Sequence, residues 1–120
     1  MKMIIAIIRP ERLESVQAEL QKVLDEEDRY RITVDTVEGH GAQQGEVEWF
    51  RGQRVRPGLV QRTRIMIAVN DKYTEPAIGA IIAGAKSGDE ASSVGDGKIF
   101  VVPLEECIRI RTGERGGPAI

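Results

Sequence analysis

The residues with the clearest chemical potential are Gly95-Asp96-Gly97-Lys98, where two glycines flank an aspartate and a lysine follows. Successive glycines allow backbone N–H groups to converge on an anion, and a lysine adds a positive charge. Ser87-Gly88 begins the same predicted loop. An isolated Asp-Gly is also typical of a hairpin turn that leads into a strand. The combination favours a loop that binds phosphate.

A second cationic segment is Arg109-Ile110-Arg111. In an extended segment alternate side chains share one side, so we expect both arginines on one side and Ile110 facing the core. Neighbouring guanidinium groups repel one another unless an anion lies between them. A solvent-exposed strand face is the alternative interpretation. The two segments together predict a polyphosphate site.

Length and composition predict a single domain over residues 1–120, with 41% hydrophobic and 30% charged residues. The apolar run at 3–8 is too short for a membrane span or a signal peptide. Cys107 is the only cysteine, which excludes an intramolecular disulfide and favours a reducing, cytoplasmic location. The net charge of -2 argues against general binding of nucleic acid.

Hydrophobic periodicity predicts alternating strands and helices. A strand buried on both faces is expected at 2–8, and Pro10 suits the first turn of the helix that follows. Residues 40–60 show neither the alternation of a strand nor the periodicity of a helix, which predicts a long loop. A loop of this length in a small domain is usually functional or mobile. The other predicted elements are strands at 32–39, 64–69 and 98–102, a helix after Asn70-Asp71 with Ile78, Ile81 and Ile82 on one face, and a short fifth strand at 108–111.

This order of elements, β-α-β-β-α-β, predicts an α+β protein of the ferredoxin-like class, a four-stranded antiparallel sheet with two helices on one face. One layer of helices leaves the other sheet face uncovered. Because the strands are rich in isoleucine, we expect another subunit to cover that face.

Four segments resemble the P-II signal-transduction proteins: residues 1–10, 39–45, 95–101 and 108–116. The similarity extends over nearly the whole chain. It implies a ferredoxin-like homotrimer with a long loop between its second and third strands. It also implies adenine nucleotides, ATP or ADP, bound in clefts between subunits, and control of a membrane transporter or metabolic enzyme of nitrogen metabolism by that loop.

The resemblance implies a nucleotide site built from two subunits. One contributes the phosphate-binding loop and the other the two arginines. Its residues would be Ile7, Thr33, Gly39, Gly41, Ser87, Gly88, Gly95, Asp96, Gly97, Lys98, Arg109 and Arg111.

The resemblance further implies binding of 2-oxoglutarate through Gln43, Gly45 and Arg62, with Gln43 as a ligand of Mg²⁺. A hard cation of this kind takes oxygen ligands from an amide, phosphates and a keto acid. Arg62 stands where the family has a lysine that pairs with the distal carboxylate. Without the resemblance, Gln43 would be interpreted as a solvated loop residue.

In the long loop, Trp49, Phe50 and Arg51 resemble the partner-binding part of the family's loop. Exposed aromatic residues frequently anchor protein contacts, although these two could instead be buried strand residues. Val55 and Gln53 occupy the positions that are nucleotidylated or phosphorylated in other members. Neither has a hydroxyl group, so we expect effector binding alone to drive any switch.

Two departures from the family pattern keep an alternative open. Ala42 replaces an arginine that contacts the γ-phosphate, and Asp89-Glu90 lies in an enlarged phosphate loop. A divergent member would sense ADP, AMP or bicarbonate and regulate a transporter other than an ammonium channel, or carbon metabolism.

Two other classes fit the sequence less well. An enzyme would need a nucleophile with a nearby base, and His40 has no evident partner for catalysis or metal binding. An RNA-binding domain of this topology would need aromatic residues on the central strands, where only Phe100 lies. We therefore expect a regulator without enzymatic activity or a nucleic-acid partner.

Overall fold

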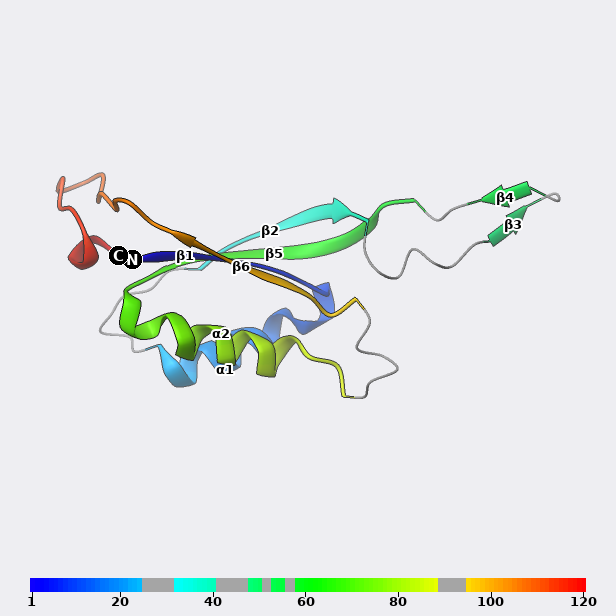
Figure 1. The fold of residues 1–120 in the computed structure, drawn as a ribbon, viewed down its shortest axis with the longest axis horizontal. Helices are drawn as coiled ribbons and strands as arrows, with labels where there is room; N and C mark the ends of the chain where they lie inside the picture. The colour runs from blue at the N-terminus through cyan, green and yellow to red at the C-terminus, as the bar shows by residue number, and fades with distance from the viewer. Residues whose placement is uncertain (25–31, 41–47, 51–52, 56–57, 89–94) are drawn as a thin grey trace.

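Four antiparallel strands form the main sheet in the order β2-β5-β1-β6 (Figure 1). They are β1 (Lys2–Ile8), β2 (Ile32–Gly39), β5 (Val60–Val69) and β6 (Gly97–Pro103). The computed structural model describes residues 1–24, 32–40, 48–50, 53–55, 58–88 and 95–120, and for 48–50 and 53–55 it describes the backbone alone. The strand order β2-β5-β1-β6, together with the two helices described next, confirms the predicted ferredoxin-like class.

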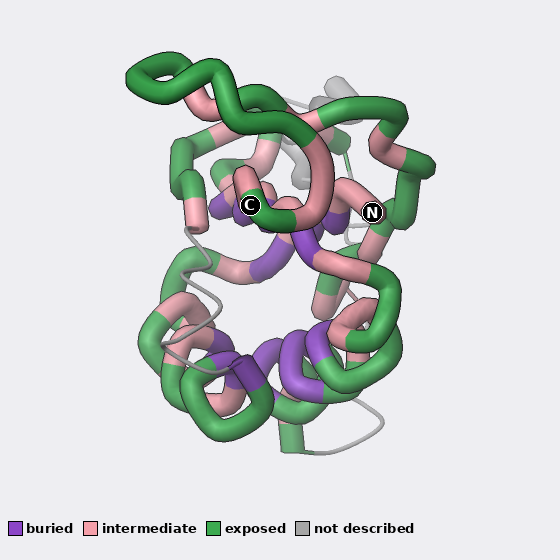
Figure 2. The backbone as a smooth tube through the Cα atoms, turned by 90° about the vertical axis from the view of Figure 1, so that its left-hand side faces the viewer, coloured by how far each residue is buried: buried purple, intermediate pink, exposed green. Residues whose placement is uncertain are grey.

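Helices α1 (Leu13–Val23) and α2 (Asp71–Ala85) lie side by side on one face of the sheet (Figure 1). Pro10 begins a short 3-10 helix, η1 (Pro10–Arg12), which leads directly into α1. Figure 2 shows the buried positions between the sheet and these helices. Neither described helix is long and apolar enough to cross a membrane. The largest fully buried side chains are Ile4, Ile8, Val16, Leu20, Ile65, Ile67 and Ile81.

Burial alternates along the central strands, because only one sheet face is covered by helices. On β1, Ile4, Ala6 and Ile8 are buried, whereas Ile5 and Ile7 are half-buried on the other face. We expected β1 to be buried on both faces. Within one chain it is fully buried only on the face that meets the helices. On β6, Phe100 shares the open face and is 49% exposed.

Ile78, Ile81 and Ile82 share one face of α2 as predicted, since all three line a cavity beside β1 and β6, but their burial differs. Ile81 is 1% exposed, but Ile82 is 51% exposed. Small residues instead form much of the contact with α1, since a Cβ on Gly84 would lie 2.5 Å from Cα of Val16. The isoleucine spacing therefore predicted one face of α2 but not the contact with α1, where Gly84 leaves no space for a large side chain.

The prediction that residues 40–60 lack regular structure is wrong in part. Two short strands, β3 (Glu48–Phe50) and β4 (Gln53–Val55), form an antiparallel hairpin that lies apart from the main sheet (Figure 1). β5 also begins at Val60, four residues before the predicted start, because its first residues pair with the end of β2.

The predicted fifth strand at 108–111 is wrong. Ile108 makes an isolated bridge with Arg115, and the intervening chain turns where the N–H of Gly113 donates to the carbonyl of Arg109 at 2.8 Å. Gly113 supports this turn with φ of +72°. Ile110 is fully exposed rather than in the core, because it lies in the turn.

Replacement of Gly84 tests the close approach of the helices. Gly84→Ala would place a methyl group against the backbone of α1, and we expect a loss of about 1–3 kcal/mol in the free energy of unfolding. Urea denaturation monitored by circular dichroism measures this loss. The control is Gly79→Ala in the same helix, where a Cβ meets nothing within 4 Å and we expect a gain of about 0.5–1 kcal/mol. Equal effects of both substitutions would contradict the packing argument.

Candidate functional site

The predicted phosphate-binding loop joins β6 at the end of β1, where Gly97 pairs with Ile8. Gly95 and Gly97 have φ of +88° and +114°, which residues with a side chain rarely adopt. A Cβ on Gly97 would also lie 1.8 Å from the carbonyl oxygen of Ile7. The chain can pass this closely over β1 only because Gly97 has no side chain.

A cavity of about 450 Å³ lies at this end of the sheet, where the loop approaches β1, β2 and β5. It brings together several of the predicted residues: Ile7, Gly39, Arg62 and the loop from Gly95 to Lys98. Sequence reasoning missed the others, which only strand pairing reveals. These are Val37, Glu38, His40, Val60 and Phe100.

The cavity combines apolar and anion-binding chemistry. Phe100 and Ile7 offer apolar surface that suits a flat ring, and Lys98 with the adjoining glycine backbone suits a charged group. Arg62 adds a second cation, and its Nη1 donates to the carbonyl of Gln61 at 3.0 Å. Such a site is suited to a ligand with an apolar part and an anionic part.

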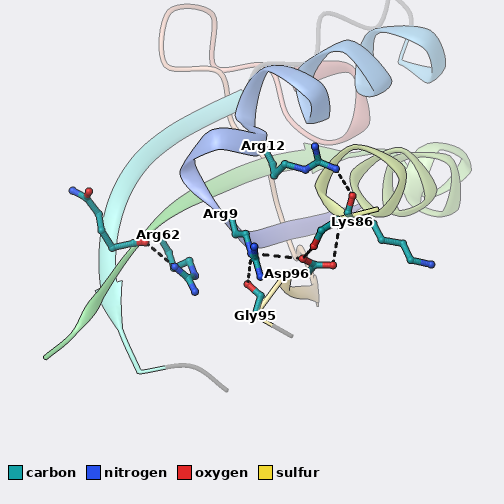
Figure 3. A network of polar contacts seen from close by, with 8 residues as sticks. Arg9, Arg12, Arg62, Lys86, Gly95 and Asp96 are labelled. Carbon is teal, nitrogen blue, oxygen red and sulfur yellow. Dashed lines mark hydrogen bonds and ion pairs between the residues drawn. The ribbon is translucent and has the colours of Figure 1, made fainter. Parts of the chain in front are cut away.

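The carboxylate of Asp96 is engaged within the chain. It accepts hydrogen bonds from the Ser87 N–H at 3.0 Å and from the Ser87 hydroxyl, and it lies 3.6 Å from Nε of Arg9 (Figure 3). The hydrogen bond from the Ser87 hydroxyl lowers the pKa of Asp96, and the charges of Arg9 and Arg12 add to this. Asp96 and Ser87 were both predicted to bind nucleotide, and in the structure they are hydrogen-bonded to one another.

Arg9 and Arg12 are polar residues near the site that sequence reasoning missed. Arg9 donates to the carbonyl of Gly95 at 3.3 Å, and Arg12 donates to the carbonyl of Lys86 (Figure 3). Arg9 directly follows Ile8, the last residue of β1. Its place just beyond the Ile8–Gly97 pair was the available signal, since it puts Arg9 opposite Asp96.

Three predicted residues lie away from this cavity in the single chain. Thr33 pairs with Met66 farther along β2. The segment that follows β6, which contains Arg109 and Arg111, lies at the opposite end of the sheet, near the chain termini (Figure 1). Because β6 alone spans about 20 Å, one chain does not bring these arginines to Lys98.

The two arginines differ in their surroundings. Nη1 of Arg109 lies 3.1 Å from a carboxylate oxygen of Glu114, and Nη2 donates to the carbonyl of Pro118 at 3.1 Å. Arg111 is exposed and has no ion-pair partner among the residues described. Arg109 is therefore held in place, while Arg111 is available to an anion.

Other predicted residues lie outside the part of the chain that the structure describes. Gly41, Gln43 and Gly45 are among them, as are Arg51 and the side chains of Trp49 and Phe50. Gly88 is described, and nothing approaches its Cα closely enough to meet a Cβ. Among the described residues, no three His, Cys, Asp or Glu side chains gather as a metal site.

Comparison with known proteins identifies the family. The family model described as "Nitrogen regulatory protein P-II" matches residues 1–114. The chain belongs to the P-II family. It is 51% identical over 120 residues to nitrogen regulatory protein GlnK1 of Methanosarcina mazei, covering all of this chain and 97% of that protein. It is 42% identical to nitrogen regulatory protein P-II of Azospirillum brasilense, with full coverage of both.

A solved structure agrees with this assignment. The crystal structure of Arabidopsis thaliana PII bound to citrate matches with a TM-score of 0.69 and 34% identity, over 96% of this chain and 84% of that one. Proteins of the P-II family are trimeric, non-enzymatic signal-transduction regulators, and they bind effectors such as ATP and 2-oxoglutarate. The chain is accordingly a regulator of the nitrogen regulatory family.

Replacement of Gly97 tests how the loop meets β1. We expect Gly97→Ala to lower the free energy of unfolding by roughly 2–5 kcal/mol, because it adds backbone strain and a contact with the Ile7 carbonyl. Thermal and urea unfolding measure the loss. Gly88→Ala is the matched control from the same segment, since its Cβ meets nothing within 4 Å. A Gly97→Ala protein as stable as this control would overturn the close-approach argument.

Proposed function

We propose that this chain forms a homotrimer that binds adenine nucleotides, ATP or ADP, in the clefts between subunits. The observation that carries the proposal is the separation of the two cationic segments. Lys98 lines the cavity at one end of the sheet, and Arg111 belongs to the segment that follows β6 beyond the other end. A second copy, placed so that its C-terminal turn meets the cavity of the first, would complete the polyphosphate site. The P-II family, whose members are trimers, supports this arrangement.

The open sheet face supports assembly. Phe100 and Val102 are 49% and 45% exposed there, and Met3, Ile5 and Met66 lie on the same face by strand register. An apolar surface of this kind favours contact with another subunit.

One polar pair interrupts the open face near the cavity. Nε and Nη2 of Arg64 donate to the two carboxylate oxygens of Asp35 at 2.9 and 2.6 Å. The hydrogen bond from Arg64 lowers the pKa of Asp35. Because both groups are already paired, this part of the face can meet a neighbour without leaving an isolated charge.

Within the proposed cleft, the ligand divides between two kinds of surface. The base would contact apolar side chains such as Ile7 and Phe100, with Thr33 contributed by a neighbouring copy. The phosphates would meet backbone N–H groups of the glycine loop, together with Lys98 and the neighbour's Arg111. Arg109, held by Glu114 and Pro118, would present its guanidinium group at a fixed position.

The second effector is proposed to be 2-oxoglutarate with Mg²⁺. The place of Arg62 in the cavity wall supports the proposal, since its guanidinium group can pair with a carboxylate. No described cluster of carboxylates or histidines could hold the metal. The ion would therefore take its oxygens from Gln43 and from the ligands themselves.

The proposed output is a change in the long loop between β2 and β5. The backbone hairpin of β3 and β4 lies away from the main sheet (Figure 1). The partner would bind this loop through Trp49, Phe50 and Arg51. The partner would be a transporter or an enzyme of nitrogen metabolism. The protein would be cytoplasmic, would reach the membrane only through such a transporter, and would have no enzymatic activity of its own.

Two sequence features support the alternative function, that of a divergent regulator that senses ADP, AMP or bicarbonate. Ala42 removes a cation near the γ-phosphate, and Asp89-Glu90 adds negative charge to the loop sequence. Both features favour ADP or AMP over ATP.

Calorimetric titration tests the ligands directly. We expect ATP and ADP to bind, and 2-oxoglutarate to bind only when ATP and Mg²⁺ are both present, because the metal would link the two ligands. Preference for ADP or AMP without any effect of 2-oxoglutarate would support the alternative regulator. If none of the three adenine nucleotides binds, the proposed function is wrong.

Mixed trimers test whether the site lies between subunits. Lys98→Ala and Arg111→Ala should each abolish or strongly weaken ATP binding, since each removes one side of the cleft. Co-expression of the two variants should restore about a quarter of the clefts, because each mixed trimer contains one intact pairing. Calorimetric stoichiometry of the mixture measures this, with each variant alone as control. A mixture that binds no more than the separate variants would contradict the arrangement.

A further inference from the structure

Three contacts tie together the two ends of the segment between α2 and β6. At the α2 end, the carbonyl of Lys86 accepts a hydrogen bond from Arg12. At the β6 end, the carbonyl of Gly95 accepts one from Arg9 at 3.3 Å. Between the ends, Asp96 accepts two hydrogen bonds from Ser87 (Figure 3). We call Arg9, Arg12, Ser87 and Asp96 the loop clamp.

Within the loop clamp, Asp96 lines the cavity, whereas the two arginines lie outside its wall. Neither Arg9 nor Arg12 lines the cavity of about 450 Å³. Arg9 and Asp96 are each only 19% exposed, and their charges face one another at 3.6 Å. Both arginines come from the turn between β1 and α1, so the clamp attaches the loop to a rigid part of the fold.

The clamp acts next to backbone of an unusual conformation. Gly95 and Gly97 both have positive φ, and Asp96 is the residue between them. Glycine has many accessible conformations, so contacts on either side are needed to hold one of them. Holding the Asp96 side chain fixes how the neighbouring N–H groups face the cavity.

We infer that Asp96 and Arg9 are positioning residues, which set the affinity for the anionic ligand by holding the glycine loop in its binding conformation. The inference rests on the proposed function, in that the ligand is taken to be a nucleotide. Asp96 therefore acts on the ligand through the backbone, and its carboxylate is not a phosphate contact. Affinity increases because less conformational entropy is lost when the ligand binds.

The sign of one substitution separates this role from simple electrostatics. If Asp96 acted on a nearby polyphosphate only through its charge, Asp96→Asn would remove a repulsion and strengthen binding. The loop clamp predicts the opposite. An amide at this position keeps an acceptor for Ser87 but loses the charge that Arg9 pairs with, so binding should weaken.

The experiment measures the dissociation constant of ATP with Mg²⁺ for the full chain and five variants. We expect Asp96→Asn and Arg9→Gln each to raise it about tenfold, and Arg9→Lys to recover part of that loss because one donor remains. The double variant Asp96→Asn/Arg9→Gln should bind ATP no more weakly than whichever single variant binds it less well, because both substitutions remove the same contact between Asp96 and Arg9. Lys22→Met, which removes an exposed ion pair on α1, is the control and should bind as the unaltered chain does.

A second readout tests the clamp without any ligand. Hydrogen exchange at the amides of residues 95–98, followed by NMR, should be about tenfold faster in Asp96→Asn than in the Lys22→Met control, while most other amides keep their rates. Unchanged exchange there would overturn the inference, as would tighter or equal ATP binding by Asp96→Asn. Failure of the unaltered chain to bind ATP, ADP or AMP would instead overturn the proposed function. In that case the exchange experiment still decides whether the clamp orders the loop.

Discussion

The close passage of Gly97 over the carbonyl of Ile7 is the contact on which the site depends. It lets β6 begin directly beside the end of β1, with no space left for a side chain. That pairing places the glycine loop against the cavity, brings Asp96 opposite Arg9, and starts β6 in the register that carries the chain to the far end of the sheet. A residue with a side chain at this position would move the loop, the cavity wall and the C-terminal turn together.

Sequence patterns predicted most of the fold, because the order of apolar strands and helices reflects burial on one side of a single sheet. The errors have local causes. Ile110 was expected in the core from simple alternation, but Gly113 allows a tight turn that leaves it exposed. The isoleucine spacing identified one face of α2 but not its contact with α1, where Gly84 lets the two helices approach closely. Strand alternation and helical periodicity predict burial only within a continuous strand or helix. A glycine can replace the strand by a turn or change how a helix packs, and neither pattern contains that information.

The candidate site was predictable where residue type alone indicates chemistry, as at the glycines of the loop and Lys98. It was not predictable where the role of a residue depends on which other residues contact it in the folded chain. Asp96 could be recognised as part of a loop motif, but only the structure pairs its carboxylate with Ser87 and Arg9. Arg9 and Arg12 lie more than 70 residues before the groups they contact. Contacts of such sequence separation follow from strand pairing in space, which local patterns do not contain.

The position of Arg109 and Arg111 at the far end of the sheet has a consequence for mass action. In the proposed trimer, a ligand that bridges two chains binds the assembled state and hardly binds the separated chains. Ligand would then favour assembly, by a free energy that grows with the logarithm of its concentration above the dissociation constant. Each cleft would report on two chains at once, so a rise in nucleotide would stabilise the ring against dissociation as well as occupy it. In such a trimer, the sheet that separates these arginines from Lys98 would couple a small-molecule signal to quaternary structure.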